Sequence, residues 1–290
     1  MKPQNQNLIG IGFMLGAMAS LPFIDVFAKF LGQMGIPILQ IVWARLTFGA
    51  LVTLPFALQA TGRAALWPDR PIYHLCRASL LILATYTFFL SLKFLPIADA
   101  LAIFFVQPLV VVVLSALVLG EKVGPRRWAA VFAGFIGTLI IIRPGFGTFN
   151  PGTLLALAAG TFLAVYFVMT RRISGTAKAM VTTFQTNAIG MIVLSSAMPL
   201  IWTDPTATQW VMLAGLGTVA TIGHFMIVRA YDFAEASLLA PFAYTEMIVA
   251  TLCGWYFFGD FPDAYTFVGV SILISSALYI SWRERKVKTG

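Results

Sequence analysis

Long apolar runs follow one another along the whole of this 290-residue chain. Each run is about twenty residues long, the length that an α-helix needs to cross a hydrocarbon core about 30 Å thick. Short segments rich in Gly, Pro, Asp and basic residues separate the runs, and these residues favour turns. The pattern predicts ten helices, at roughly 8–31, 39–59, 73–93, 98–119, 126–142, 152–172, 180–202, 209–231, 237–258 and 264–282.

Composition identifies the surroundings of these helices. The chain is 59% hydrophobic and 10% charged, whereas soluble domains carry roughly 25% charged residues. The first apolar run exceeds the about 7–15 residues of a signal-peptide core, and no small-residue cleavage site follows it. We therefore predict an all-α membrane protein in which the first run is a retained span and no soluble domain is present.

The basic residues predict the orientation. With the N-terminus in the cytoplasm, all but four of the 19 Lys and Arg residues fall on the cytoplasmic side or next to it. The exceptions are Lys29, Lys93 and Arg143 on the outer side and Arg45 within a helix. The positive-inside rule then predicts a multi-pass protein of the inner cell membrane with both termini cytoplasmic. The formal charge of +8 thus points to membrane lipids as partners and not to nucleic acid.

Two halves of the chain resemble each other. "KFLPIADA" (93–100) matches "RAYDFAEA" (229–236), and "LGEKVGPRRWAAV" (119–131) matches "FGDFPDAYTFVGV" (258–270). Each half holds five predicted helices, an odd number, so the second copy must cross the membrane in the opposite sense. We predict two inverted five-helix repeats, residues 1–147 and 148–290, the architecture of many secondary transporters.

Three segments carry a resemblance to a known family: "DVFAKFL" (25–31), "ADALAIFFVQPLVVVVLSALVLGE" (98–121) and "SLLAPFAYTEMIVATLCGWYFFGDFPD" (237–263). In them the chain resembles the ten-helix EamA-type permeases of the drug/metabolite transporter superfamily, nearest the S-adenosylmethionine and riboflavin permeases. The resemblance implies a bundle with a central cavity and no ATPase domain. It implies transport of S-adenosylmethionine, riboflavin, an amino acid or a drug-like solute.

Charged residues inside the predicted spans are candidates for coupling or gating. Asp25 and Lys29 are four residues apart, so they share a helix face and can pair. Arg45, near the outer end of the second helix, competes with Lys29 for Asp25, and the sequence does not choose between them. An alternative is a purely structural ion pair. Glu246 is predicted near the middle of the ninth helix, and intramembrane carboxylates usually face the bundle interior or water. It is either a proton-coupling group or a hydrogen-bonded packing residue.

Prolines and polar aromatic residues mark the predicted substrate site. Pro22, Pro108 and Pro241 each free a carbonyl four residues earlier, so they either line the site or merely kink their helices. The predicted substrate contacts are side chains within spans that carry a group able to form hydrogen bonds or stack on a planar ligand. They are Tyr86, Gln107, Tyr166, His224 and Tyr244.

Several other functions find no support in the sequence. "GIGFMLG" has the spacing G-x-G-x-x-x-G, which is not the dinucleotide-binding motif; Gly12, Gly16 and Ser20 instead fit close helix packing. No Walker A sequence and no metal-ligand spacing occur, so we expect neither a cofactor nor a metal. We predict a monomeric or weakly dimeric secondary transporter of a small organic metabolite, working by alternating access, with coupling to protons or exchange. The alternatives are a lipid flippase and a membrane-embedded enzyme.

Overall fold

The computed structural model describes residues 4–118, 125–142, 150–173, 178–233, 242, 245–272 and 274–275. Helices form almost all of this described part, and it contains no strand. The helices are α1 (Gln4–Ser20), α2 (Pro22–Gln33), α3 (Ile38–Thr61), the 3-10 turn η1 (Gly62–Leu66), α4 (Pro71–Ser91), α5 (Ile97–Phe104), α6 (Gln107–Val118), α7 (Pro125–Ile142), α8 (Pro151–Arg172), α9 (Ala179–Ser195), α10 (Met198–Ile201), α11 (Ala207–Phe233) and α13 (Thr245–Phe258). A further helical stretch covers 264–272.

The protein is an all-α membrane protein. Within the described residues, five helical segments are long and apolar enough to cross a membrane: Leu8–Gln33, Ile38–Leu66, Pro71–Ser91, Pro151–Thr170 and Ala207–Ile227. Each of the ten predicted helices overlaps a helix of the structure. The total of ten crossings stays a prediction, since the ninth and tenth predicted helices lie partly outside the described residues.

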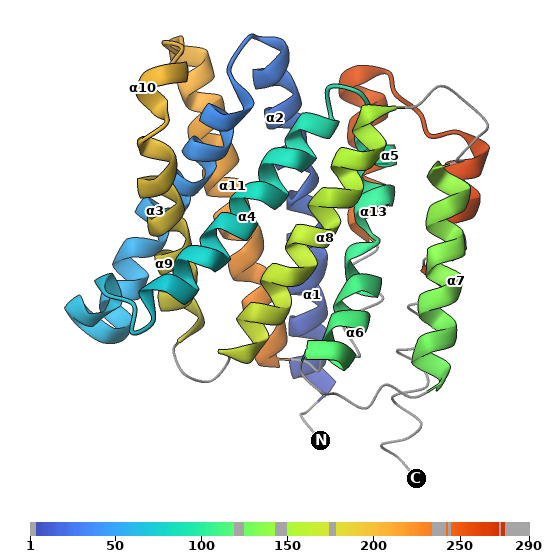
Figure 1. The fold of residues 1–290 in the computed structure, drawn as a ribbon, viewed down its shortest axis with the longest axis horizontal. Coiled ribbons are helices and arrows are strands. Elements are labelled where there is room, and N and C mark those ends of the chain that lie inside the picture. Colours follow the sequence, from blue (N-terminus) through green and yellow to red (C-terminus); the bar gives the residue numbers. More distant parts are fainter. Residues whose placement is uncertain are drawn as a thin grey trace.

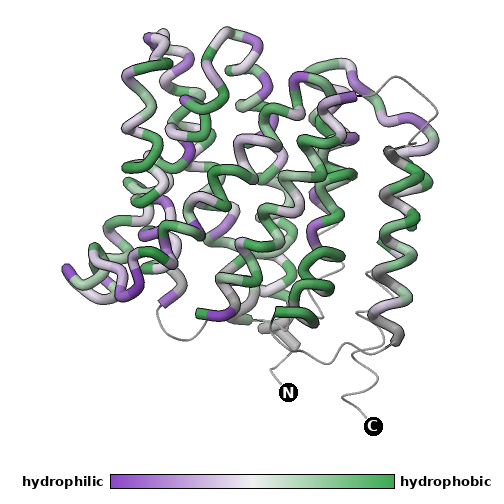
Figure 2. The backbone as a smooth tube through the Cα atoms, viewed as in Figure 1, coloured by the Kyte–Doolittle hydropathy of each residue, from purple (hydrophilic) through white to green (hydrophobic). Residues whose placement is uncertain are grey.

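Apolar side chains cover the outside of the bundle as well as its interior. Figure 2 shows hydrophobic positions along nearly every described helix. A single buried cluster joins α2, α3, α4, α5, α8, α9, α11 and α13. Large side chains such as Leu200, Val211 and Tyr256 nevertheless remain exposed. A soluble monomer rarely exposes so much apolar surface, whereas a lipid-facing surface requires it.

Two predicted helices are interrupted where their prolines lie. Pro22 is the first residue of α2, directly after the single residue Leu21 that separates it from α1. Pro108 is the second residue of α6, and α5 ends at Phe104, four residues earlier. Because proline has no N–H, the carbonyls of Met18 and Phe104 lose their helical donors. Pro241 lies outside the described residues, four positions before α13 begins.

The freed carbonyl of Phe104 faces a glycine of the second half. A Cβ atom added to Gly160 of α8 would lie 2.7 Å from the Phe104 oxygen and 2.9 Å from Cγ1 of Val106. Real Cβ atoms do not approach a backbone oxygen so closely, so the backbone of α8 can contact the α5–α6 interruption only because residue 160 lacks a side chain.

Only some of the small residues in α1 lie at a close contact with another helix. Gly16 packs against the end of the Met226 side chain of α11, and a Cβ at Gly223 would lie 3.3 Å from Oγ of Ser20. Gly12, in contrast, would meet nothing within 4 Å. Close packing of α11 on α1 and on Leu21 therefore depends on the missing side chains of Gly16 and Gly223 and not on that of Gly12.

The main contacts between helices of the first half and helices of the second half have counterparts in which the equivalent helices have changed places (Figure 1). α4 packs on α8, while α11 packs on α1 and α2; α3 packs on α11, while α9 packs on α4. Two further contacts, α3 with α9 and α5 with α13, join equivalent elements of the two halves. This pairing agrees with inverted repeats over 1–147 and 148–290, which stay a prediction.

Replacing Gly160 by Ala should destabilise the protein. The added methyl group must displace the Phe104 carbonyl or separate α8 from the α5–α6 interruption, and overpacking of this kind typically costs about 1–3 kcal/mol. The matched control is Gly12→Ala in α1, whose methyl group meets open space. Thermal unfolding of both variants in one detergent measures the difference. Equal unfolding midpoints for the two variants would contradict the close backbone contact.

Candidate functional site

Five polar side chains from five helices interact inside the bundle. Arg45 of α3 interacts electrostatically with Asp25 of α2. It interacts in the same way with Tyr166 of α8 and His224 of α11. Asp25 in turn interacts with Glu246 of α13. We call Asp25, Arg45, Tyr166, His224 and Glu246 the central cluster; it draws on both halves of the chain.

Arg45 is oriented by a residue that the sequence did not single out. Its guanidinium donates a hydrogen bond of 2.5 Å to Oγ1 of Thr85 in α4, which is buried. Tyr86, the predicted contact, is the next residue; adjacent helical residues point to different faces, and Tyr86 packs against the hydrophobic core. Guanidinium carries five N–H donors, so Arg45 keeps donors for a ligand.

A hydrogen bond to the backbone fixes the tautomer of the His224 imidazole. Its Nδ1 lies 2.8 Å from the carbonyl oxygen of Ala220, one turn earlier in α11. A carbonyl can only accept, so Nδ1 carries the hydrogen of this bond and Nε2 remains as an acceptor. The side chain is exposed although it interacts electrostatically with Arg45 in the bundle. His224 therefore contributes Nε2 to the central cluster as a hydrogen-bond acceptor.

Both carboxylates of the central cluster lie in the first turn of their helices. Asp25 is the fourth residue of α2 and only 7% exposed, and Glu246 is the second residue of the described α13 and half-buried. The prediction that Glu246 lies near the middle of a helix over 237–258 stays a prediction, because most of residues 237–244 lie outside the described residues. Backbone N–H groups at a helix start favour negative charge.

Lys29 does not pair with Asp25. Its ammonium lies 2.7 Å from Oδ2 of Asp260, in the segment that follows α13, and 4.5 Å from the ring centroid of Phe258. Of the two partners that the sequence left open for Asp25, the structure has Lys29 paired elsewhere, and the charge that acts on Asp25 is that of Arg45. The Lys29–Asp260 ion pair joins two segments that are 231 residues apart.

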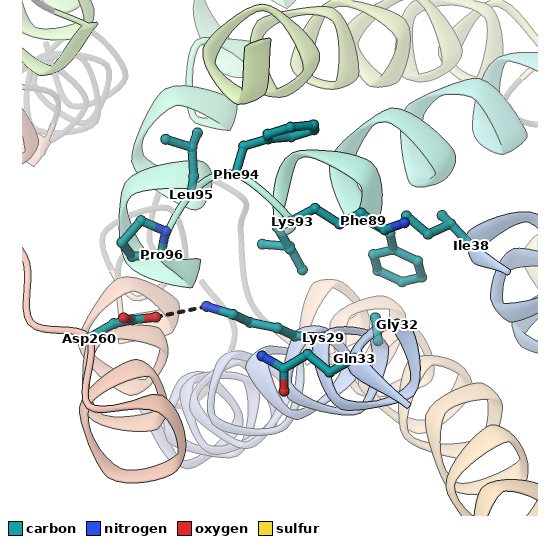
Figure 3. Close-up of a pocket in the computed structure, with 12 residues that line it drawn as sticks. Lys29, Gly32, Gln33, Ile38, Phe89, Lys93, Phe94, Leu95, Pro96 and Asp260 are labelled. Atoms are coloured by element: carbon teal, nitrogen blue, oxygen red, sulfur yellow. Dashed lines mark hydrogen bonds and ion pairs between the residues drawn. The ribbon is translucent and has the colours of Figure 1, made fainter. Parts of the chain in front are cut away.

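A pocket of about 510 Å³ lies around this ion pair (Figure 3). We call it the mouth pocket. In Figure 3, the Lys29 side chain reaches from α2 toward Asp260, while Lys93 and Phe89 approach from the end of α4. The mouth pocket is lined by Ala28, Lys29, Gly32, Gln33, Ile38, Phe89, Leu92, Lys93, Phe94, Leu95, Pro96 and Asp260.

The remaining predicted residues fall in two groups. Gln107 is the half-buried first residue of α6, at the α5–α6 interruption. Tyr244 and Pro241 lie outside the described residues. Among the residues that the structure describes, no group of three His, Cys, Asp or Glu side chains is placed to hold a metal ion.

Comparison with known proteins decides the family. The EamA-like transporter family model matches residues 8–143 and again residues 150–282. The chain belongs to the EamA-like transporter family. This membership confirms the predicted family within the drug/metabolite transporter superfamily. EamA-like transporters are multi-pass membrane proteins, in keeping with the apolar helices.

The relatives are transporters of small molecules. The chain is 27% identical to an S-adenosylmethionine uptake transporter of Rickettsia bellii, over 96% of this chain and 95% of that protein. It is 28% identical to a riboflavin transporter of Vibrio cholerae, over 99% and 97%. A protein of known crystal structure that is 20% identical shares the fold, with a TM-score of 0.67 over 98% of each chain. EamA-family membership and these relatives identify a small-metabolite transporter and not an enzyme.

Charge balance in the central cluster is testable through stability. Asp25→Asn leaves the Arg45 guanidinium without its negative neighbour and should lower the free energy of unfolding by about 1–3 kcal/mol, because an uncompensated buried charge is costly. Adding Arg45→Gln removes that charge and should restore part of the loss. Thermal unfolding in detergent measures both effects, with Asp69→Asn, an exposed carboxylate, as the control. Additive losses in the double variant would show that Asp25 and Arg45 are not coupled.

Proposed function

We propose that the protein is a secondary carrier that moves a cationic or zwitterionic metabolite with a planar ring across the inner membrane by alternating access. The observation that carries the proposal is the central cluster itself. It combines one guanidinium, two carboxylates, an imidazole and a phenol from five helices of both halves. Polar groups at the interface of two repeats are the usual site of substrate and coupling ion in such carriers.

Each group has a counterpart on a zwitterionic ligand. The free N–H donors of Arg45 suit a carboxylate, since guanidinium binds carboxylates in a bidentate manner. Asp25 and Glu246 suit an ammonium or another cationic centre. The ring of Tyr166 suits a planar group by stacking. The same two carboxylates are the groups through which proton or exchange coupling would act.

S-adenosylmethionine fits this set better than riboflavin does. It carries a carboxylate, an ammonium group, a sulfonium centre and a planar adenine ring, and so has a partner for every kind of group in the central cluster. Riboflavin has the planar ring but neither charge. Each compound is the named substrate of a relative, and the two relatives have nearly the same sequence identity to this chain. The choice between the compounds therefore rests on the charges of the central cluster.

The loops between the helices are short, so in the proposed carrier the helices themselves must move to open and close the site. α3 and α4 are joined by η1 and a few residues, and α4 and α5 by the five residues 92–96. We propose that a unit with both termini cytoplasmic, a monomer or a weak homodimer, rocks its two halves about the central cluster. The interruptions at Pro22 and Pro108 suit bending of this kind, because their freed carbonyls loosen the helices there.

Reconstitution into liposomes tests the proposal. Labelled S-adenosylmethionine should enter saturably and show counterflow when unlabelled compound is inside. Arg45→Gln should lower the initial rate by at least about tenfold, the effect of losing a charge-assisted bond worth about 1.5–3 kcal/mol. Arg63→Gln makes the same change at the exposed side chain in η1 and should leave the rate unchanged.

Two results would overturn it. Saturable flux of riboflavin without any flux of S-adenosylmethionine would remove the proposed charge recognition. Full activity of both Asp25→Asn and Arg45→Gln would remove the central cluster from the transport site.

A further inference from the structure

The mouth pocket carries more positive than negative charge. Two ammonium groups, Lys29 and Lys93, line it together with one carboxylate, Asp260. Lys29 is paired with Asp260 at 2.7 Å. Lys93 is exposed, and within the described residues it has no carboxylate partner. One positive charge in the mouth pocket is therefore left for a ligand.

The size of the mouth pocket suits a small molecule or part of one. Its volume of about 510 Å³ falls in the range of about 300–1,000 Å³ that is usual for small-ligand sites. Phe89, Leu92 and Ala28 are buried and give it an apolar floor. Polar groups at the rim and an apolar floor are the usual composition of a ligand site.

The mouth pocket lies one helical turn from the central cluster along two helices. Lys29 follows Asp25 by four residues in α2, and Phe89 follows Thr85 by four residues in α4. Four residues of α-helix advance about 6 Å. The mouth pocket is thus the next compartment toward the end of the bundle, and the buried Ala28 and Phe89 are among its lining residues.

We propose that the mouth pocket is a second binding site, selective for a carboxylate group, through which the solute passes between water and the central cluster. This inference rests on the proposed function. The carboxylate binds Lys93 first and then competes with Asp260 for Lys29. An ammonium group on the same solute binds the Asp260 carboxylate that is released.

The Lys29–Asp260 ion pair then acts as a latch. It joins α2 of the first half to the segment after α13 in the second half. Phe30 of α2 packs on Phe257 and Phe258 beside it, with ring centroids 6.0 and 4.7 Å apart. Opening the ion pair removes the ionic contact between α2 and the segment after α13 and leaves their apolar contacts, so a bound carboxylate favours separation of the halves at this end.

Charge selectivity of the mouth pocket is measured without any transported substrate. In a background without native thiols (Cys76→Ser with Cys253→Ser), a cysteine at the exposed lining residue Gln33 (Gln33→Cys) is labelled with an anionic and a cationic methanethiosulfonate. The anionic reagent should react faster, and Lys93→Gln should lower the anionic-to-cationic ratio of rates by at least about fivefold, because a local charge concentrates counter-ions. Asp260→Asn should raise the ratio. Arg63→Gln, in η1, is the control and should leave the ratio unchanged.

Carboxylate binding is measured with acetate as the probe. Acetate should slow anionic labelling more than chloride of equal ionic strength does, by at least about twofold, and Lys93→Gln should remove the difference. Equal slowing by acetate and chloride would overturn carboxylate selectivity. A rate ratio that does not respond to Lys93→Gln would overturn the binding site.

The labelling rate of a native thiol tests whether the Lys29–Asp260 ion pair acts as a latch. Cys253 of α13 is buried and interacts electrostatically with Asp25, so in a Cys76→Ser background its labelling by a membrane-impermeant reagent reports access to the core. Asp260→Asn should raise the labelling rate by about threefold or more, as expected for loss of a partly exposed ion pair. An unchanged rate would overturn the latch. If the labelling results hold but reconstituted protein carries no zwitterion, the proposed function fails and the mouth pocket does not.

Discussion

Charged side chains within a lipid-facing bundle need partners, and this requirement shapes the protein. A single charge at the centre of a transmembrane helix costs about 2.5–3.5 kcal/mol by insertion scales. Here the Arg45 guanidinium lies among a carboxylate, a hydroxyl, a phenol and an imidazole from other helices. No one helix can satisfy it. The helices that enclose the central cluster are therefore held together by the same interactions on which the proposed substrate site depends.

The backbone contributes to the same region. The α5–α6 interruption at Pro108 frees the Phe104 carbonyl, and Gly160 lets the backbone of α8 approach it. Tyr166 follows Gly160 by six residues in α8, and Asp25 lies in the first turn after the Pro22 interruption. Irregular backbone is tolerated at membrane depth only where protein or water satisfies it. The interruptions and the central cluster thus lie in the same part of the bundle for one reason.

Local patterns in the sequence predicted the helices and the family, but they left the partner of Asp25 open and missed those of Lys29 and Arg45 in other segments. Apolar runs and their dividers are local features, so ten segments and two proline interruptions could be placed before any contact was known. The Lys29–Asp260 pair joins residues 231 positions apart, and spacing along one helix shows only which residues share its face. Thr85 escaped notice because its hydroxyl matters only through Arg45 of another helix. Tyr86, its neighbour, is more conspicuous in sequence yet packs in the core.

Exposure explains why two kinds of ionic contact coexist. The side chains of Lys29 and Asp260 are 11% and 30% exposed, and ion pairs that water can reach are worth roughly 0–1 kcal/mol. A contact of that strength can form and break in every cycle. The charges around the buried Asp25 are different, because separating them without a replacement leaves a charge that neither water nor protein compensates. In the transport cycle that we propose, a solute with both charges supplies that replacement, so the central cluster rearranges only when the solute is present, whereas the Lys29–Asp260 pair opens first.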